Sequence, residues 1–118
     1  MTGPTMKAAV LHGPGRIVVE NVPVPTLGPG EALVAVRAAG ICGSDVPRMK
    51  RAEIPRLPLV LGHEFAGEVV RVSEGAGPVN PGDRVVVIPL IPCGRCDLCQ
   101  AGEFAMCENY DYLGSRRD

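Results

Sequence analysis

Four of the five cysteines of this chain fall within one short stretch, PCGRCDLCQAGEFAMC. They are Cys93, Cys96, Cys99 and Cys107, with the spacing C-x2-C-x2-C-x7-C. Two intervening residues let a short loop turn both thiolates toward one centre, and a fourth sulfur that returns after a longer loop can complete a tetrahedron around Zn2+. The stretch has almost no hydrophobic periodicity, so something other than a core must hold it in shape. We predict a structural zinc lobe over residues 92–108.

These cysteines have three alternatives to a zinc site. A ferredoxin-type iron–sulfur run is C-x2-C-x2-C-x3-C-P, whereas here the fourth cysteine lies farther away and is followed by Glu108. Disulfides are typical of secreted proteins, but the polar start of the chain does not resemble a signal peptide. Four unrelated buried thiols so close together are uncommon. Clustered thiols without a leader predict a protein of the reducing cytoplasm.

A second group of potential metal ligands is spread over two segments. Cys42 lies in the segment GICGSD, and His63 and Glu64 follow one another in GHE. A catalytic zinc site uses three protein ligands and an open position, so Cys42 and His63 need a third ligand. It comes either from Glu64 or from residues outside this chain. On the pattern alone, a buried cysteine and a satisfied histidine are the commoner explanation.

The rest of the sequence is punctuated by turns. Fifteen glycines and twelve prolines favour short strands over long helices. We expect strands at 6–11, 16–22, 31–38, 67–72 and 83–88, and one short helical turn at 44–50. This spacing and turn chemistry predict a small β-barrel or sandwich.

Composition sets broad limits on the function. With 118 residues, 46% hydrophobic and 21% charged, the chain is typical of one globular domain. A net charge of −1 gives no general attraction to nucleic acid or to an anionic membrane. No stretch approaches the ~20 apolar residues of a membrane helix. We expect neither nucleic acid nor a membrane as a partner.

Several motifs in a fixed order resemble one enzyme family. The segments AAGICGSD, GHEFAGEVV and NPGDRVVV, together with the four-cysteine lobe, resemble the medium-chain zinc-dependent alcohol dehydrogenases. The resemblance covers essentially the whole chain. The segments CGSDVPR and ENYDYLGSRRD are similar to the polyol dehydrogenases, and among them to galactitol-1-phosphate 5-dehydrogenase-like members.

This resemblance implies a mainly β fold, a GroES-like, partly open β-barrel that carries the cysteine-rich zinc lobe. Residues 1–118 would form the N-terminal portion of the catalytic domain. A Rossmann domain that binds NAD or NADP would belong to the full-length enzyme, because this chain has no G-x-G-x-x-G between a strand and a helix. We expect the full-length enzyme to be a homo-oligomer and this chain alone to be inactive.

The resemblance also assigns roles to individual residues. Cys42 and His63 would bind a catalytic zinc, and Glu64 would be an adjacent carboxylate that binds it intermittently. Asp45 would accept the imidazole N–H of His63 and fix its tautomer. Ser44 would accept the proton of the substrate hydroxyl. A further cysteine or glutamate ligand would lie beyond residue 118.

Two features concern the substrate. Pro47 stands where many relatives have a histidine that ends the proton relay, so here the relay must end elsewhere. Four positive side chains follow closely: Arg48, Lys50, Arg51 and Arg56. They would suit a phosphorylated substrate, or they belong to an ordinary solvated loop.

The expected function of the full-length protein is oxidation of a secondary hydroxyl in an alcohol or polyol, by hydride transfer to nicotinamide. The alternative is a non-catalytic, zinc-stapled binding or scaffold module, which would need neither the CGSD nor the GHE segment. A quinone-reductase-like relative without catalytic zinc would lack both these ligands and the cysteine lobe.

Overall fold

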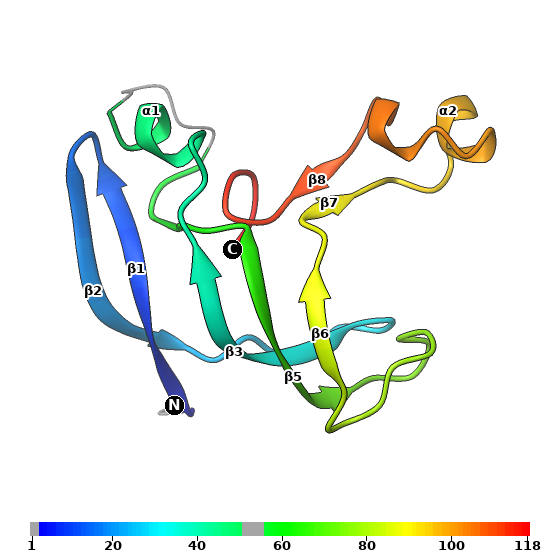
Figure 1. The fold of residues 1–118 in the computed structure, drawn as a ribbon, viewed down its shortest axis with the longest axis horizontal. Helices are drawn as coiled ribbons and strands as arrows, with labels where there is room; N and C mark the ends of the chain where they lie inside the picture. Colours follow the sequence, from blue (N-terminus) through cyan, green and yellow to red (C-terminus); the bar gives the residue numbers. More distant parts are fainter. Residues whose placement is uncertain (1–2, 51–55) are drawn as a thin grey trace.

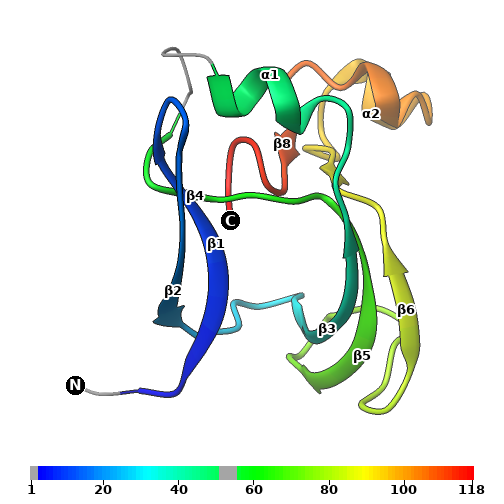
Figure 2. The ribbon, with the colours of Figure 1, turned by 60° about the vertical axis from the view of Figure 1, so that its left-hand side comes forward.

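The computed structural model describes residues 3–50 and 56–118, so Arg51 of the positive cluster lies outside the described residues. The described chain forms two three-stranded antiparallel sheets and one two-stranded sheet. Figures 1 and 2 show the two larger sheets facing one another, with the two-stranded sheet and the cysteine lobe extending to one side.

The first sheet is a hairpin with a short third strand. Strands β1 (Thr5–Gly13) and β2 (Arg16–Pro23) pair antiparallel, and β4 (Leu59–Val60) pairs with the other edge of β1. Gly15 has a φ of 69° in the turn between β1 and β2, a conformation that glycine adopts without steric cost. This sheet supplies most of the small core.

The second sheet brings distant segments together. It has the order β3 (Ala32–Gly40), β5 (Glu64–Val72) and β6 (Arg84–Val87). Gly40, the last residue of β3, lies opposite Glu64, the first residue of β5. The segment that follows β3, with Cys42, therefore lies near the segment that leads into β5, with His63, and this register positions the candidate site.

The remaining elements are short. Helix α1 (Asp45–Lys50) follows β3, and β7 (Leu90–Ile91) leads into the cysteine lobe. The lobe contains α2 (Asp97–Gln100) and the 3-10 turn η1 (Phe104–Met106), and the chain then returns through β8 (Asp111–Tyr112), which pairs with β7. Figure 1 shows the lobe projecting away from the β1–β2 hairpin.

Few side chains are buried. The buried hydrophobic residues are Ala8, Val10, Leu11, Leu59, Val69, Cys99 and Cys107. On the open side, Val86 of edge strand β6 and the nearby Ile88 are 82% and 79% exposed. Among the described residues, the buried polar or charged ones are Asp45 and His63. The barrel is therefore partly open, and its buried polar groups coincide with the predicted second metal site.

The sequence-based expectations for the fold are confirmed. The five expected strands correspond to β1, β2, β3, β5 and β6, and the helical turn corresponds to α1. The fold is mainly β with open sheets. Strands β4, β7 and β8 were not predicted, because two residues are too few to display an alternating pattern. Of the helices described, none has both the length and the apolar character needed to cross a membrane.

Candidate metal centres

The four cysteines of the lobe converge. The sulfur atoms of Cys93, Cys96, Cys99 and Cys107 all lie within 4.8 Å of one another, and all four are free thiols. The sulfur atoms of Cys93 and Cys99 are 4.0 Å apart. A tetrahedral zinc with Zn–S distances of about 2.3 Å requires sulfur atoms roughly 3.8 Å apart. The donor set therefore fits Zn2+, and the thiols are not joined as disulfides.

Local turns and hydrogen bonds hold these sulfurs together. Gly94 and Gly102 have φ values of 70° and 83°, so the chain turns sharply after Cys93 and after α2. The backbone N–H of Cys93 donates to the Cys107 sulfur at 3.2 Å. Hydrogen bonds from the backbone N–H of Arg95 and, next in size, from that of Cys96 lower the pKa of Cys93 to about 6.

Cys99, on α2, differs from Cys93. Its burial, as the largest cause, raises the pKa of this thiol to about 12. A buried thiol of this kind gives up its proton when it binds a metal cation. The lobe thus combines the thiol of Cys93, which ionises readily, with the thiol of Cys99, which needs a bound cation to lose its proton.

A second donor group lies where β3 and β5 meet. Ligand atoms of Cys42, His63 and Glu64 lie within 4.8 Å of one another. At Gly40, an added Cβ would lie 2.9 Å from a Glu64 carboxylate oxygen, so the glycine leaves room for this side chain. A cavity of about 680 Å³ is lined by all three donors and by Tyr112. Sulfur, nitrogen and oxygen donors beside a cleft fit a zinc site with one open position.

Asp45 links these residues from the first turn of α1. Its side chain is buried; one carboxylate oxygen accepts the backbone N–H of Cys42 at 3.0 Å, and the other accepts Arg48 Nη1 at 3.1 Å. The oxygen bound by Arg48 lies 3.5 Å from Nδ1 of His63. That nitrogen is buried without a hydrogen-bond partner. The predicted pairing of Asp45 with His63 is therefore present as a close approach, not as a formed hydrogen bond.

Ser44 lies beside the second donor group but not on the cleft wall. It is exposed, and its backbone N–H donates to the Cys42 sulfur at 3.5 Å. Ser44 does not belong to the set of residues that line the 680 Å³ cavity. Its role as the acceptor of the substrate proton stays a prediction.

Sequence reasoning missed Tyr112. Its ring meets the His63 ring edge to face, with centroids 5.5 Å apart and an interplanar angle of 67°. The turn that follows Tyr112 packs closely against Gly62, the residue before His63. An added Cβ on Gly114 in this turn would collide with the Gly62 carbonyl oxygen. The available signal was composition, because Tyr112 is one of only two tyrosines and follows the cysteine lobe directly.

The positive side chains after Pro47 are partly paired. Arg48 contacts Asp45 at 3.1 Å, and Arg56 contacts Asp118 at 3.0 Å. The pairing of Arg48 was visible in the sequence as an i, i+3 charge pair on one short helix. Arg48 is therefore held against a buried carboxylate, whereas the Arg56 pair lies at the surface, with side chains 50% and 39% exposed.

Comparison with known proteins identifies the family. The model of the alcohol dehydrogenase GroES-like domain matches residues 28–116. The chain belongs to this family. It is 40% identical to a sorbitol dehydrogenase of Bacillus subtilis over 93% of this chain and 32% of that protein. It is 38% identical to galactitol 1-phosphate 5-dehydrogenase of Escherichia coli K12, over 96% of this chain and 33% of that protein.

A solved structure gives the same assignment. A protein from Sinorhizobium meliloti, assigned as a zinc-binding dehydrogenase and bound to NADP, has a TM-score of 0.88 and 42% identity. The match covers 98% of this chain and 34% of that structure. The chain thus spans about a third of the length of the curated relatives it matches.

Proposed function

We propose that this chain is the catalytic-domain portion of a zinc-dependent, NAD(P)-linked alcohol or polyol dehydrogenase, which oxidises a secondary hydroxyl by hydride transfer to nicotinamide. The observation that carries this proposal is the convergence of Cys42, His63 and Glu64 within 4.8 Å at the wall of a 680 Å³ cleft. The similarity to sorbitol and galactitol 1-phosphate dehydrogenases supports a polyol as the substrate class.

The two donor groups would hold metal for different purposes. Cys93, Cys96, Cys99 and Cys107 form a closed set of four thiols, which suits a structural zinc. Cys42, His63 and Glu64 supply three ligands beside a cleft, which suits a catalytic zinc with an open position. A zinc bound there would supply Lewis-acid polarisation of a substrate hydroxyl.

The chain's own residues would orient the substrate and move its proton. Asp45 orients the donors, because it holds the backbone of Cys42 and lies next to His63. Ser44 would take the proton of the substrate hydroxyl and, being exposed, pass it to solvent, since Pro47 cannot carry it. The wall of the cleft also includes the apolar residues Phe65, Ala66 and Val87. The hydride acceptor would be held by a nicotinamide-binding domain outside this chain.

The alternative of a non-catalytic zinc-stapled module is less well supported. Such a module needs the cysteine lobe, but it gains nothing from a second donor set beside an open cavity. The buried Nδ1 of His63 has no hydrogen-bond partner, which costs stability, and a non-catalytic module has no use for such a group. The proposal also includes a homo-oligomeric enzyme of the cytoplasm; the five free thiols support a reducing compartment.

The test is Cys42→Ser in the protein joined to its nicotinamide-binding domain. Turnover of hexitols with NAD or NADP should fall below detection, and elemental analysis should show the loss of one zinc and the retention of the other. The control Val19→Ser changes a residue that is 72% exposed on β2, and should alter neither quantity. Full turnover in Cys42→Ser would overturn the proposal. The 118-residue chain alone should show no coenzyme-dependent turnover, because it lacks the positioned nicotinamide.

A further inference from the structure

The imidazole of His63 is buried, but its buried nitrogen makes no hydrogen bond that would fix the ring. The side chain is 5% exposed, and within the described residues its Nδ1 has no hydrogen-bond partner. The Asp45 carboxylate oxygen that faces this nitrogen lies 3.5 Å away. The torsion that turns an imidazole about its Cβ–Cγ bond has only a broad, roughly two-fold preference. Another contact must therefore set the orientation of the ring.

This orientation decides which atoms of His63 face the donor group. A ligand histidine binds metal through one ring nitrogen, and a partner at the other nitrogen usually holds the ring in place. Here Nδ1 faces Asp45, which leaves Nε2 for the donor group that Cys42 and Glu64 complete. A half-turn about the Cβ–Cγ bond would put ring carbons where the two nitrogens now lie. A loosely held ring would therefore present a ligand atom to the metal only part of the time.

Tyr112 makes a contact that restricts this rotation. Its ring meets the His63 ring edge to face, with centroids 5.5 Å apart and an interplanar angle of 67°. This is one of the arrangements that aromatic rings prefer at such a separation. Both residues line the 680 Å³ cavity, so the contact lies at the wall of the cleft itself. The imidazole cannot turn without losing this packing.

The backbone of Tyr112 is held firmly enough to position another ring. Tyr112 pairs with Leu90 in the β7–β8 ladder, and its carbonyl oxygen accepts the backbone N–H of Arg116 at 2.9 Å. The turn that follows is fixed as well, because Gly114 packs directly against the backbone of Gly62. The ring of Tyr112 therefore projects from a backbone that is constrained on both sides.

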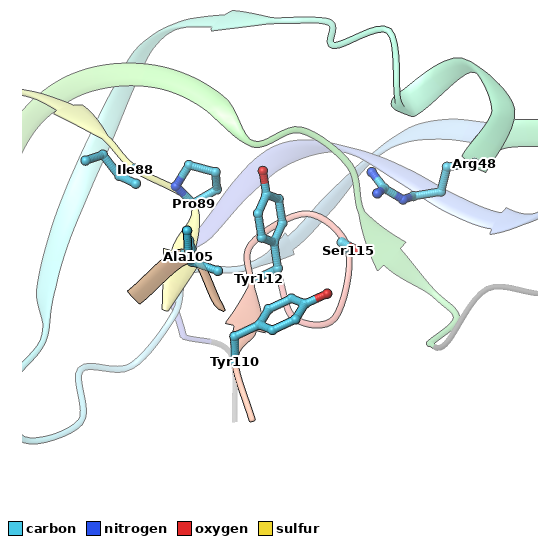
Figure 3. A pocket seen from close by; sticks show the side chains of 8 residues that line it. Arg48, Ile88, Pro89, Ala105, Tyr110, Tyr112 and Ser115 are labelled. Atoms are coloured by element: carbon cyan, nitrogen blue, oxygen red, sulfur yellow. The ribbon is translucent and has the colours of Figure 1, made fainter. Parts of the chain in front are cut away.

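The other tyrosine of the chain provides a matched comparison. Tyr110 and Tyr112 both line a neighbouring hollow of about 510 Å³, but Tyr110 does not line the cavity beside the donor group. The Tyr110 ring lies under Arg116 instead, whose guanidinium carbon is 4.2 Å from the ring centroid. Figure 3 shows the two tyrosine side chains pointing in different directions. Two aromatic rings only two residues apart thus differ in their contact with His63.

We propose that Tyr112 is a positioning residue of the cleft, whose ring holds the His63 imidazole so that one nitrogen faces Asp45 and the other faces the metal. The inference rests on the proposed function, because it gives a purpose to the ligand nitrogen of His63. The ring of Tyr112 carries this role, and its hydroxyl does not.

The test is a titration with Co2+ of the protein joined to its nicotinamide-binding domain. Zinc is kept in the cysteine lobe, whose closed set of four thiols should hold metal more tightly than the three donors of the cleft. The visible absorption of Co2+ in the cleft reports how many protein ligands it has and of which type. The readout is therefore metal binding and its spectrum, and neither coenzyme nor turnover enters it.

Tyr112→Leu keeps an apolar side chain in the wall but removes the ring. The affinity of the cleft for Co2+ should fall about 10-fold, the usual scale for losing a residue that orients a metal ligand, and the absorption at saturation should change. Tyr112→Phe keeps the ring and should bind Co2+ as the wild type does, with the same spectrum. Tyr110→Leu is the matched control and should leave both quantities unchanged. Elemental analysis of the lobe zinc and thermal unfolding check the fold of each variant.

The outcomes separate a positioning role from a general effect on the structure. Equal Co2+ affinity in Tyr112→Leu and the wild type would overturn the proposal and leave the metal site intact. Equal losses in Tyr112→Leu and Tyr112→Phe, or in Tyr112→Leu and Tyr110→Leu, would also overturn it. A wild-type cleft that binds no Co2+ would overturn the proposed function together with this inference. A protein that shows every expected metal result but oxidises no alcohol would count against the dehydrogenase alone.

Discussion

The two donor groups of this protein are built in opposite ways. In the lobe, all four ligands lie between Cys93 and Cys107, and short turns bring them together. In the cleft, Cys42 follows β3 whereas His63 and Glu64 lie at the start of β5, so the strand pairing must form first. A local site can assemble with its metal, whereas a site made from distant segments depends on the fold around it.

The two regions also differ in what stabilises them. Within the lobe, Cys99 and Cys107 are buried, while Phe104 and Met106 are 51% and 65% exposed. Such a segment has almost no apolar core of its own. The cleft, in contrast, is stabilised by the β3–β5 pairing and by the buried carboxylate of Asp45. We therefore expect the lobe to respond to metal removal and the cleft to respond to changes in packing and charge.

The largest effect should follow from removing the metal of the lobe. A structural zinc contributes about 10 kcal/mol to the folding of small metal domains. After chelation, amide hydrogen exchange between Cys93 and Cys107 should become fast, while the amides of β3 and β5 stay protected. Zinc added back should restore protection, and cadmium serves as a second thiolate-binding probe. Unchanged exchange in the lobe would mean that its turns are stable without a cation.

The next effect should come from Asp45→Asn. This change leaves Arg48 without its charged partner in a largely buried position, which should lower the free energy of unfolding by about 3 kcal/mol. Metal affinity at the cleft should fall about 10-fold or more, since Asp45 holds the backbone of Cys42 and lies 3.5 Å from Nδ1 of His63. Urea unfolding and zinc titration measure the two quantities.

Zinc bound by the lobe should remain in Asp45→Asn, because the four thiols of the lobe are separate from the donor group of the cleft. Glu74→Gln, an exposed residue, is the matched control and should leave both quantities unchanged. Loss of the lobe metal in Asp45→Asn would show that the two regions are not independent.

The same difference explains what the sequence could predict. The lobe and the longer strands were predictable, because ligand spacing and alternation are local properties. The pairing that places Glu64 next to Cys42 is a matter of register, which no short motif specifies. Tyr112 was missed for a similar reason: it meets His63 through the packing of Gly114 on Gly62, a contact between distant turns.

A smaller effect should come from the strand pairing itself. An added Cβ at Gly67 on β5 would collide with the Ala35 carbonyl oxygen and the Val34 side chain of β3. Gly67→Ala should therefore destabilise the sheet by about 2 kcal/mol, the usual scale of overpacking, and weaken metal binding at the cleft. Lobe protection in hydrogen exchange should not change. At Gly13, where nothing lies within 4 Å of an added Cβ, the same substitution should have little effect on stability.

The smallest effect should come from Arg37→Gln. Arg37 and Glu68 form an ion pair at 3.5 Å across β3 and β5, with side chains 71% and 43% exposed. Water screens such a pair, so its loss should change the free energy of unfolding by about 0.3 kcal/mol. The same substitution at Arg48, whose partner Asp45 is only 5% exposed, should cost several times more. Urea unfolding of the two variants in parallel measures the difference. If both substitutions lower the free energy of unfolding equally, burial of the charges does not make the cleft more sensitive than the surface to the loss of an ion pair.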